Sequence, residues 1–483
     1  MKKKTLFINF CFLFLTFSVF AQNNDIAWNY EEKNQNVDIT PDRDVVWVFD
    51  TVEKEKVVEK KVKEKGPFRI PNRNFETGIL NLTLGASNNF MSTFEIFKEK
   101  VTIDFDKLSN GLNINTNLFL SPVFFNYNKK DKWGYGLSTG LEVFGIVDLN
   151  GNMLTFHEAD SVNSDIGAGV FAEVNVHGFL TFQKFKIKVK PAVYYPLFYA
   201  IPKNFSYTYE NKKVNGVDET YYNLELDMRV FTPFPMDKDF EFKDIFDIFN
   251  TIKDTITDIS AKPGIDISIG AEYPLSEVLG LTEKFNFLDF DVGIDFINIP
   301  LYRSVMEDYI PIIANVGNGD EPIEIFNELI SGNPEDIDFD KYFSYNIGDP
   351  DKDKIKITRP FKMIISANWR PFGSPFKSDN NEINKQKREW LIFTPMLGFA
   401  INPIYFKPFS FEGGIKTRFS FINFFIAALN IGYYDRLWKN SLDLALNLRF
   451  FEIDIGASMQ SADFLKSWSG GGYGATFGLK FGW

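Results

Sequence analysis

The last residues of the chain constrain its fold most, because they alternate strictly between two kinds of side chain. In the segment 472–483, every second position from Tyr473 to Trp483 is aromatic or aliphatic, and the positions between are glycine, threonine or lysine. A period of two is the period of a β-strand. One apolar face and one small or polar face suit a wall with lipid on one side and water on the other. The segment therefore predicts a membrane-spanning strand, with an edge strand of a soluble β-sandwich as the alternative.

The composition fits such a wall. Aromatic residues make up 17% of the chain, more than a soluble core needs, and they suit lipid-facing surfaces and interfacial girdles. The mean hydropathy of −0.15 is nevertheless slightly negative, as expected when every second strand residue faces water. The net charge of −12 argues against nucleic acid as a partner of the whole chain.

The beginning of the chain, 1–21, has the organisation of a secretory signal peptide. Lys2 to Lys4 give the positive start, Leu6 to Phe17 is largely apolar, and Val19 and Ala21 supply small residues for cleavage. The only cysteine, Cys11, lies in this segment. The mature chain is then free of thiols, which suits an oxidising compartment and excludes cysteine catalysis and thiolate metal sites.

Residues 22–74 show no strand alternation. Glu53 to Lys65 is a dense run of glutamate and lysine, and the segment ends near Gly66-Pro67 and Pro71. This composition predicts a solvated periplasmic arm or short helix, with contact to a periplasmic partner as the alternative.

From Gly78 onward, period-two alternation dominates, as in Ile166 to Leu180. A barrel over 75–483 follows, with strands of about ten residues, the length that a tilted membrane crossing requires. Including a short strand at Phe205 to Tyr209, we count about sixteen strands, with fourteen as the alternative. Tight links then fall on the periplasmic side and long ones outside, at 86–111, 150–163, 234–262, 298–356 and 460–471, while one long link, 371–389, falls on the periplasmic side.

Two outer links carry a helical pattern of apolar residues. Phe242 to Ile259 and Ile323 to Ile330 show apolar side chains at intervals of three and four. These short helices either cap the barrel mouth by packing on one another or form a lid or apolar platform for a substrate.

The leader, the alternation and the terminal aromatic together resemble bacterial outer-membrane β-barrel proteins. The resemblance implies that Phe477, Phe481 and Trp483 form an assembly signal read by the barrel-assembly machinery, and that outer-membrane lipid surrounds the wall. Length and apolar outer links also resemble, weakly, the fatty-acid transporter family, whose barrels usually have fourteen strands. That family carries an N-terminal plug, and no apolar hatch segment precedes residue 75.

If the apolar face meets lipid, the polar face lines the lumen and its charges mark a candidate solute pathway. Fixed charges of both signs in a narrow passage can sort ions, although they can equally pair across strands and hold the wall together. A basic ladder on one strand is the best selectivity candidate, because like charges at every second residue are hard to neutralise. The pathway residues are Lys184, Lys186, Lys188, Lys190, Asp289, Asp291, Asp295 and Arg418.

Catalysis and metal binding have little support. The chain has two histidines, His157 and His177, and neither lies in a catalytic motif or offers zinc a ligand set. We therefore predict no enzyme, no cofactor and no metal. The sequence predicts an outer-membrane β-barrel channel or transporter for small solutes. The alternative is a structural or adhesive surface barrel with a sealed lumen.

Overall fold

The structure is a computed structural model that describes residues 74–89, 112–129, 132–150, 164–182, 185–214, 217–233, 262–281, 285, 287–317, 343–372, 390–405, 407–421 and 424–482. These residues form one antiparallel sheet that closes on itself, because the first strand, β1 (Phe75–Asn88), pairs with the last, β19 (Gly472–Gly482). The predicted leader, 1–21, and all but the end of the predicted arm, 22–74, lie outside the described residues.

The rest of the described chain is almost entirely strand, with two short helices, α7 (Leu275–Val278) and η3 (Lys466–Trp468). No described helix is long and apolar enough to cross a membrane. The remaining strands are β2 (Leu112–Ser121), β3 (Phe124–Lys129), β4 (Trp133–Leu149), β5 (Ser164–Phe182), β6 (Phe185–Val214), β7 (Val217–Phe231), β8 (Gly264–Tyr273), β9 (Asp289–Tyr302), β10 (Ser304–Gly317), β11 (Phe343–Ile347), β12 (Asp351–Ile357), β13 (Phe361–Arg370), β14 (Leu391–Ile401), β15 (Phe409–Phe421), β16 (Phe425–Tyr434), β17 (Leu437–Asn447) and β18 (Phe451–Ser461).

Several of these segments are pieces of one wall strand. β2 and β3 both lie between β1 and β4, and β7 and β8 both pair with β6. β9 runs into β10, and β11 and β12 lead into β13. Counted this way, the barrel has fourteen strands, the alternative count, rather than sixteen.

The two surplus strands of the sequence count have a structural explanation. Phe205 to Tyr209 is not a separate strand, because β6 runs on through it for 30 residues. The segment 232–263 interrupts a single wall strand, so that its two halves, β7 and β8, look like two strands in the sequence.

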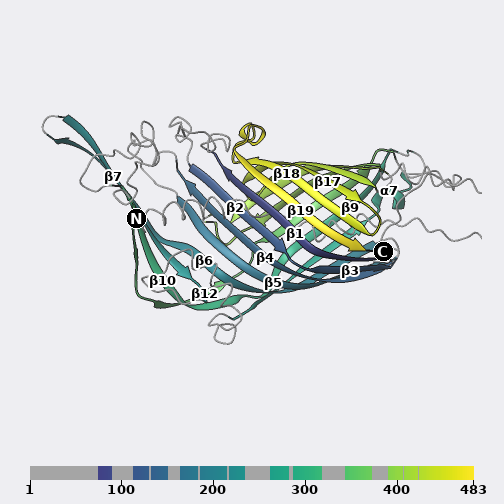
Figure 1. The fold of residues 1–483 in the computed structure, drawn as a ribbon, viewed down its shortest axis with the longest axis horizontal. Coiled ribbons are helices and arrows are strands. Elements are labelled where there is room, and N and C mark those ends of the chain that lie inside the picture. The colour runs from purple at the N-terminus through teal and green to yellow at the C-terminus, as the bar shows by residue number, and fades with distance from the viewer. Residues whose placement is uncertain are drawn as a thin grey trace, which may run out of the picture.

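The two ends of the barrel differ. At the end where β1 begins and β19 finishes, here called the near end, tight links join β5 to β6, β15 to β16 and β17 to β18. At the opposite, far end, β6, β7 and β10 extend beyond the shorter strands of the other side (Figure 1). β10, β11 and β12 occupy much of 298–356, which the sequence analysis treated as an outer link. The predicted outer helices lie outside the described residues.

Side chains alternate between lipid-facing and lumenal positions, as predicted. On β5, Val174 and Val176 are 52% and 54% exposed, whereas Glu173 and Asn175 are buried at 3% and 2%. The apolar face therefore points outward and the polar face inward, the arrangement of a membrane barrel rather than of a soluble sheet. The buried core of this molecule is its lumen.

The closing strand follows the same rule. β19 pairs with β18 on one side and β1 on the other. Phe481 is on the outer face and partly exposed, while Lys480 is 1% exposed on the inner face. The two faces read from the sequence are confirmed, and Trp483 lies outside the described residues.

Candidate functional site

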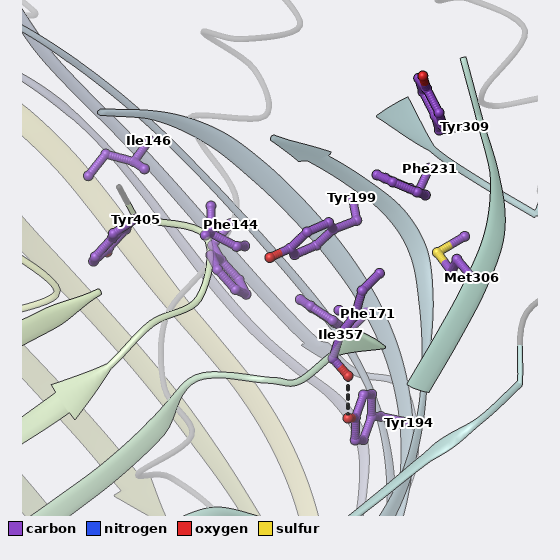
Figure 2. Packing of buried hydrophobic residues seen from close by; sticks show 11 residues of the cluster. Phe144, Ile146, Phe171, Tyr194, Tyr199, Phe231, Met306, Tyr309, Ile357 and Tyr405 are labelled. Atoms are coloured by element: carbon purple, nitrogen blue, oxygen red, sulfur yellow. Dashed lines mark hydrogen bonds between the residues drawn. The ribbon is translucent and has the colours of Figure 1, made fainter. Parts of the chain in front are cut away.

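An apolar layer fills one side of the lumen. It is made by inward-facing side chains of β4, β5, β6, β7, β10 and β12, together with two residues of the link between β14 and β15 (Figure 2). Phe144 and Phe171 stack with ring centroids 5.7 Å apart, and Phe171 meets Tyr194 edge to face. The buried members are Phe144, Ile146, Phe171, Tyr194, Tyr199, Phe231, Met306, Tyr309, Ile357, Ile404 and Tyr405.

The link between β14 and β15, described at 402–405 and 407–408 and here called the plug link, enters the lumen from the far end and reaches the opposite wall. Ile404 and Tyr405 are only 2% and 6% exposed. On β5, Gly167 and Gly169 have no side chain, and a Cβ atom at Gly167 would lie 2.4 Å from the carbonyl oxygen of Ile404. The two glycines thus form a recess that only the absence of side chains makes deep enough for Ile404.

Hydrogen bonds fix the shape of the plug link. The backbone N–H of Asn402 donates to the carbonyl of Pro408 (2.8 Å), and the side-chain oxygen of Asn402 accepts from the N–H of Ile404 (3.1 Å). The Tyr199 hydroxyl of the opposite wall donates to the carbonyl of Pro403 (3.2 Å). Burial raises the pKa of the Tyr405 hydroxyl well above its ordinary value, so this ring stays neutral in its enclosed position.

A tight hairpin holds the plug link from the neighbouring side. Asp435 and Arg436 join β16 to β17 with φ angles of 49° and 66°, which non-glycine residues rarely adopt. The Arg436 guanidinium lies 4.5 Å from the ring centroid of Tyr405, pairs with Asp165 on β5 and donates to the carbonyl of Lys407. Arg436 therefore bridges the lumen from this hairpin to β5 over the plug link. Positive φ at both central residues is the geometry of a two-residue type I′ hairpin turn.

A buried charged cluster lies next to the apolar layer. Arg359, between β12 and β13, is 2% exposed and makes two hydrogen bonds of 2.9 Å to Asp266. It also pairs with Glu173 and donates to Asn298 (3.2 Å). The guanidinium lies 5.4 Å from the Tyr194 ring centroid, so the cluster and the apolar layer are in direct contact.

The other side of the lumen is lined by small and polar side chains. On β1, β18 and β19 these include Thr83, Gly85, Ser458 and Thr476. Thr476 donates to Asp443 of β17 (3.2 Å). Toward the near end of the barrel, the buried ammonium group of Lys480 lies 2.9 Å from the carboxylate of Glu452.

The predicted basic ladder lies in the lumen, but carboxylates of other strands meet it. Lys188 pairs with Glu272 of β8, Lys186 lies 3.7 Å from the same carboxylate, and Lys190 lies 3.6 Å from Glu173. The expectation that the ladder is hard to neutralise was wrong, because register brings Glu272 directly opposite Lys186. Lys184 lies outside the described residues.

Two carboxylates of the predicted acidic row are likewise paired with a cation of another strand. Asp289 lies 3.5 Å from Arg370 of β13, and Asp291 pairs with the same guanidinium. Asp295 pairs in register with Gly270 of β8. Arg418 lies on β15, where it pairs in register with Ile392 and Ala428, far along the sequence from the other charges.

The residues that close the lumen were missed by the sequence analysis. Arg359, Ile404, Tyr405 and Arg436 belong to links or strand ends, where period-two alternation gives no signal. A usable signal was present at the plug link, since Asn402-Pro403 and Pro408 bracket an apolar stretch within a link. Nothing in the sequence showed that Gly167 and Gly169 face this stretch.

Of the two histidines, the structure describes only His177. His177 faces the lumen from β5, with its Nε2 2.6 Å from the Asn126 side-chain oxygen, and His157 lies outside the described residues. Within the ranges described, no three His, Cys, Asp or Glu side chains are grouped so that they could hold a metal ion.

Comparison with known proteins gives similarity of overall shape only. The chain is an outer-membrane-type β-barrel. No family model and no curated protein matches it. Among solved structures, the toluene transporter TbuX of Ralstonia pickettii is similar at 8% identity, over 85% of this chain and 90% of that one, with a TM-score of 0.39. The P. putida toluene transporter TodX is similar at 8% identity, over 85% of this chain and 91% of that one, with a TM-score of 0.38. The translocator domain of the Neisseria meningitidis autotransporter NalP is similar at 6% identity, over 85% of this chain and 89% of that one, with a TM-score of 0.30. At these values the matches carry no information on solute or mechanism.

Proposed function

We propose that the protein is an outer-membrane channel for small solutes, closed in this conformation by its own plug link. The observation that carries the proposal is the docking of Ile404 in the recess of Gly167 and Gly169. A barrel can be sealed by its wall side chains alone. Here a link from the far end crosses the lumen, and links are the elements that move at low cost.

The arrangement of the wall supports a location in the outer membrane. Exposed apolar side chains such as Leu397 and Phe411, at 73% and 71%, suit contact with lipid. If the near end faces the periplasm, the far end is the extracellular opening of the barrel, and the plug link closes it. Phe477, Phe481 and Trp483 then serve as the assembly signal for the barrel-assembly machinery, following export through the leader.

The lumenal charges form the solute pathway in this proposal. Lys186, Lys188 and Lys190 on β6, with Asp289, Asp291 and Asp295 on β9, line the passage from the near end toward the plug link. Because Lys188 and Glu272 are paired, the passage presents alternating charges rather than one sign, which favours small neutral or zwitterionic solutes over ions of one charge.

Conductance of the refolded protein in planar bilayers tests the proposal. Ile404→Asp places a charge in the apolar recess, so we expect the plug link to leave it and the conductance to rise at least tenfold over the wild type. Leu465→Asp is the matched control, because Leu465 is 76% exposed in the link before β19 and is not a member of the apolar layer that contains Ile404. We expect wild-type conductance from it. If Ile404→Asp folds and inserts but carries no current, the channel proposal fails.

A sealed structural or adhesive barrel is the second candidate, favoured by the cluster around Arg359. A guanidinium bound by Asp266 and Glu173 resists displacement, since leaving either carboxylate buried and unpaired is costly. A barrel of this kind stays closed with the plug link displaced. The Ile404→Asp experiment therefore separates the two candidates.

A further inference from the structure

A row of lysines crosses the outer surface of the barrel toward the far end, on the wall formed by β8, β10 and β12 (Figure 1). Lys262, just before β8, bridges to Val305 of β10, and Val305 pairs in register with Lys356 of β12. Residues directly opposite one another in a sheet project to the same face. The three side chains therefore share one face, with a lysine on either side of the valine.

This face is the outer one. Ile357, the neighbour of Lys356 on β12, belongs to the apolar layer in the lumen. Because successive side chains of a strand point to opposite faces, Lys356 points away from the lumen. Lys352 and Lys354 precede it at every second position of β12, so they point outward as well. These three lysines and Lys262, here called the lysine row, are all exposed.

The lysine row lies at the level where the lipid-facing wall ends. β8 runs over ten residues from the near end, the length of a tilted crossing of the hydrocarbon core. Where β8 begins, Ile265 pairs with Tyr302 of β9, and both side chains are exposed, at 39% and 69%. A tyrosine in this position is typical of the aromatic girdle at a membrane surface. Lys262, just beyond Ile265, therefore lies at the height of the lipid headgroups.

The outward carboxylates of β10 balance only part of this positive charge. Lys354 lies 3.0 Å from Glu307, and Lys352 is opposite Asp308 in register. Within the part of the chain that the structure describes, the two lysines that flank Val305 have no ion-pair partner. With four lysines against two carboxylates, the lysine row carries two unbalanced positive charges.

The acids of β12 itself serve other partners. Asp351 accepts a hydrogen bond from the Tyr309 hydroxyl (3.1 Å), and Asp353 pairs with Arg229 of β7. Both aspartates alternate with the lysines along the strand, so they lie on its other face. The outer face of β12 is therefore basic, and its lysines are left for a partner from outside the barrel.

We infer that the lysine row binds the phosphate of an anionic lipid headgroup in the surrounding membrane leaflet. Neighbouring strands are about 4.8 Å apart, so Lys262 and Lys356 are separated by about 10 Å, and their long side chains can meet at one phosphate. The acyl chains of the same lipid lie along Ile265 and Tyr302. This continuity of the lysines with the apolar wall favours a lipid over a soluble anion. The inference goes beyond the channel and holds whether or not the barrel conducts.

Lipid binding by the folded full-length protein in uncharged detergent micelles tests the inference. Native mass spectrometry compares phosphatidylglycerol, which has a net negative headgroup, with phosphatidylcholine, in which a quaternary amine balances the phosphate. We expect the wild type to bind phosphatidylglycerol at least tenfold more tightly, and excess inorganic phosphate to leave the lipid bound. Equal affinity for the two lipids overturns the inference, and displacement by inorganic phosphate overturns lipid as the ligand.

Paired variants locate the binding at the lysine row. Each lysine near an anionic lipid surface contributes roughly fivefold in affinity, so Lys262→Gln/Lys356→Gln should weaken phosphatidylglycerol binding at least tenfold. Lys262→Arg/Lys356→Arg keeps both charges, and we expect wild-type affinity from it. Loss of binding in the arginine variant would contradict recognition by charge.

A second pair of lysines at the near end provides the matched control. Lys129→Gln/Lys132→Gln also removes two exposed lysines, so it changes the net charge by the same amount. We expect this variant to bind phosphatidylglycerol as the wild type does. Heat-modifiable migration confirms that each variant is folded, and equal losses of affinity in the two glutamine variants would contradict a site at the lysine row.

Discussion

The two sides of the lumen are built on different principles. On the side of β4 to β12, large side chains such as Phe171, Phe231 and Met306 are almost completely buried and meet one another and Ile404. On the side of β1 and β16 to β19, the inner face carries glycine, serine, threonine and asparagine together with buried charged residues such as Lys439, Glu452 and Lys480, and a chamber of about 70 Å³ remains open there. The first side is packed like a protein core, and the second is lined like a passage.

The difference shows how one wall can both close and conduct. Period-two alternation places a side chain inward at every second residue on both sides, but the size of that side chain decides whether the lumen is filled. The plug link contributes to the filled side through Ile404 and to the chamber through Asn402. It lies at the boundary between the two, where a small movement changes both.

The largest effect is expected from removal of the buried cation on the filled side. Arg359→Met leaves Glu173 and Asp266 buried without their partner, which costs about 3–5 kcal/mol of unfolding free energy. Urea titration of the protein folded into lipid vesicles, followed by tryptophan fluorescence, measures this loss. Lys354→Met is the control, because its pair with Glu307 is exposed, and we expect an unchanged urea midpoint.

A core truncation on the filled side should be nearly as costly. Phe171 is fully buried between Phe144 and Tyr194, so Phe171→Ala leaves a cavity and lowers the unfolding free energy by about 3 kcal/mol. Phe411→Ala, on the lipid-facing surface, removes the same atoms without making a cavity in the lumen. Equal losses in the same urea titration would show that the filled side is not packed as a core.

A smaller effect is expected on the side of the chamber. Thr476→Val keeps the side-chain shape and removes the hydrogen bond to Asp443, at a cost of about 1 kcal/mol. A loss as large as that of Phe171→Ala would contradict the contrast between the two sides.

Much of the barrel could be predicted from the sequence, because alternation reports which side of a strand is buried. The faces of β5 and β19 were predicted correctly from Val174, Glu173, Phe481 and Lys480. Strand number was less secure, since the segment 232–263 divides one wall strand and hides its continuity. Local pattern cannot show that β7 and β8 share the same neighbour.

The candidate site was far less predictable. That Glu272 neutralises Lys186 and Lys188 depends on the register between β6 and β8, which no local pattern records. The recess for Ile404 depends on two glycines more than 200 positions earlier in the sequence (Gly167 and Gly169), whose small size also fits a plain strand. Long-range pairing, rather than composition, creates this site.

Filling the recess tests the central claim most directly. A Cβ at Gly167 would lie 2.4 Å from the carbonyl oxygen of Ile404, so the side chain of Gly167→Leu leaves the plug link no room to dock. In planar bilayers, we expect Gly167→Leu to conduct at least tenfold more than the wild type. Gly178→Leu, on the same strand but where a Cβ meets no atom closer than 3.3 Å, is the control and should conduct as the wild type does. Wild-type conductance from folded and inserted Gly167→Leu would contradict closure of the barrel by the plug link.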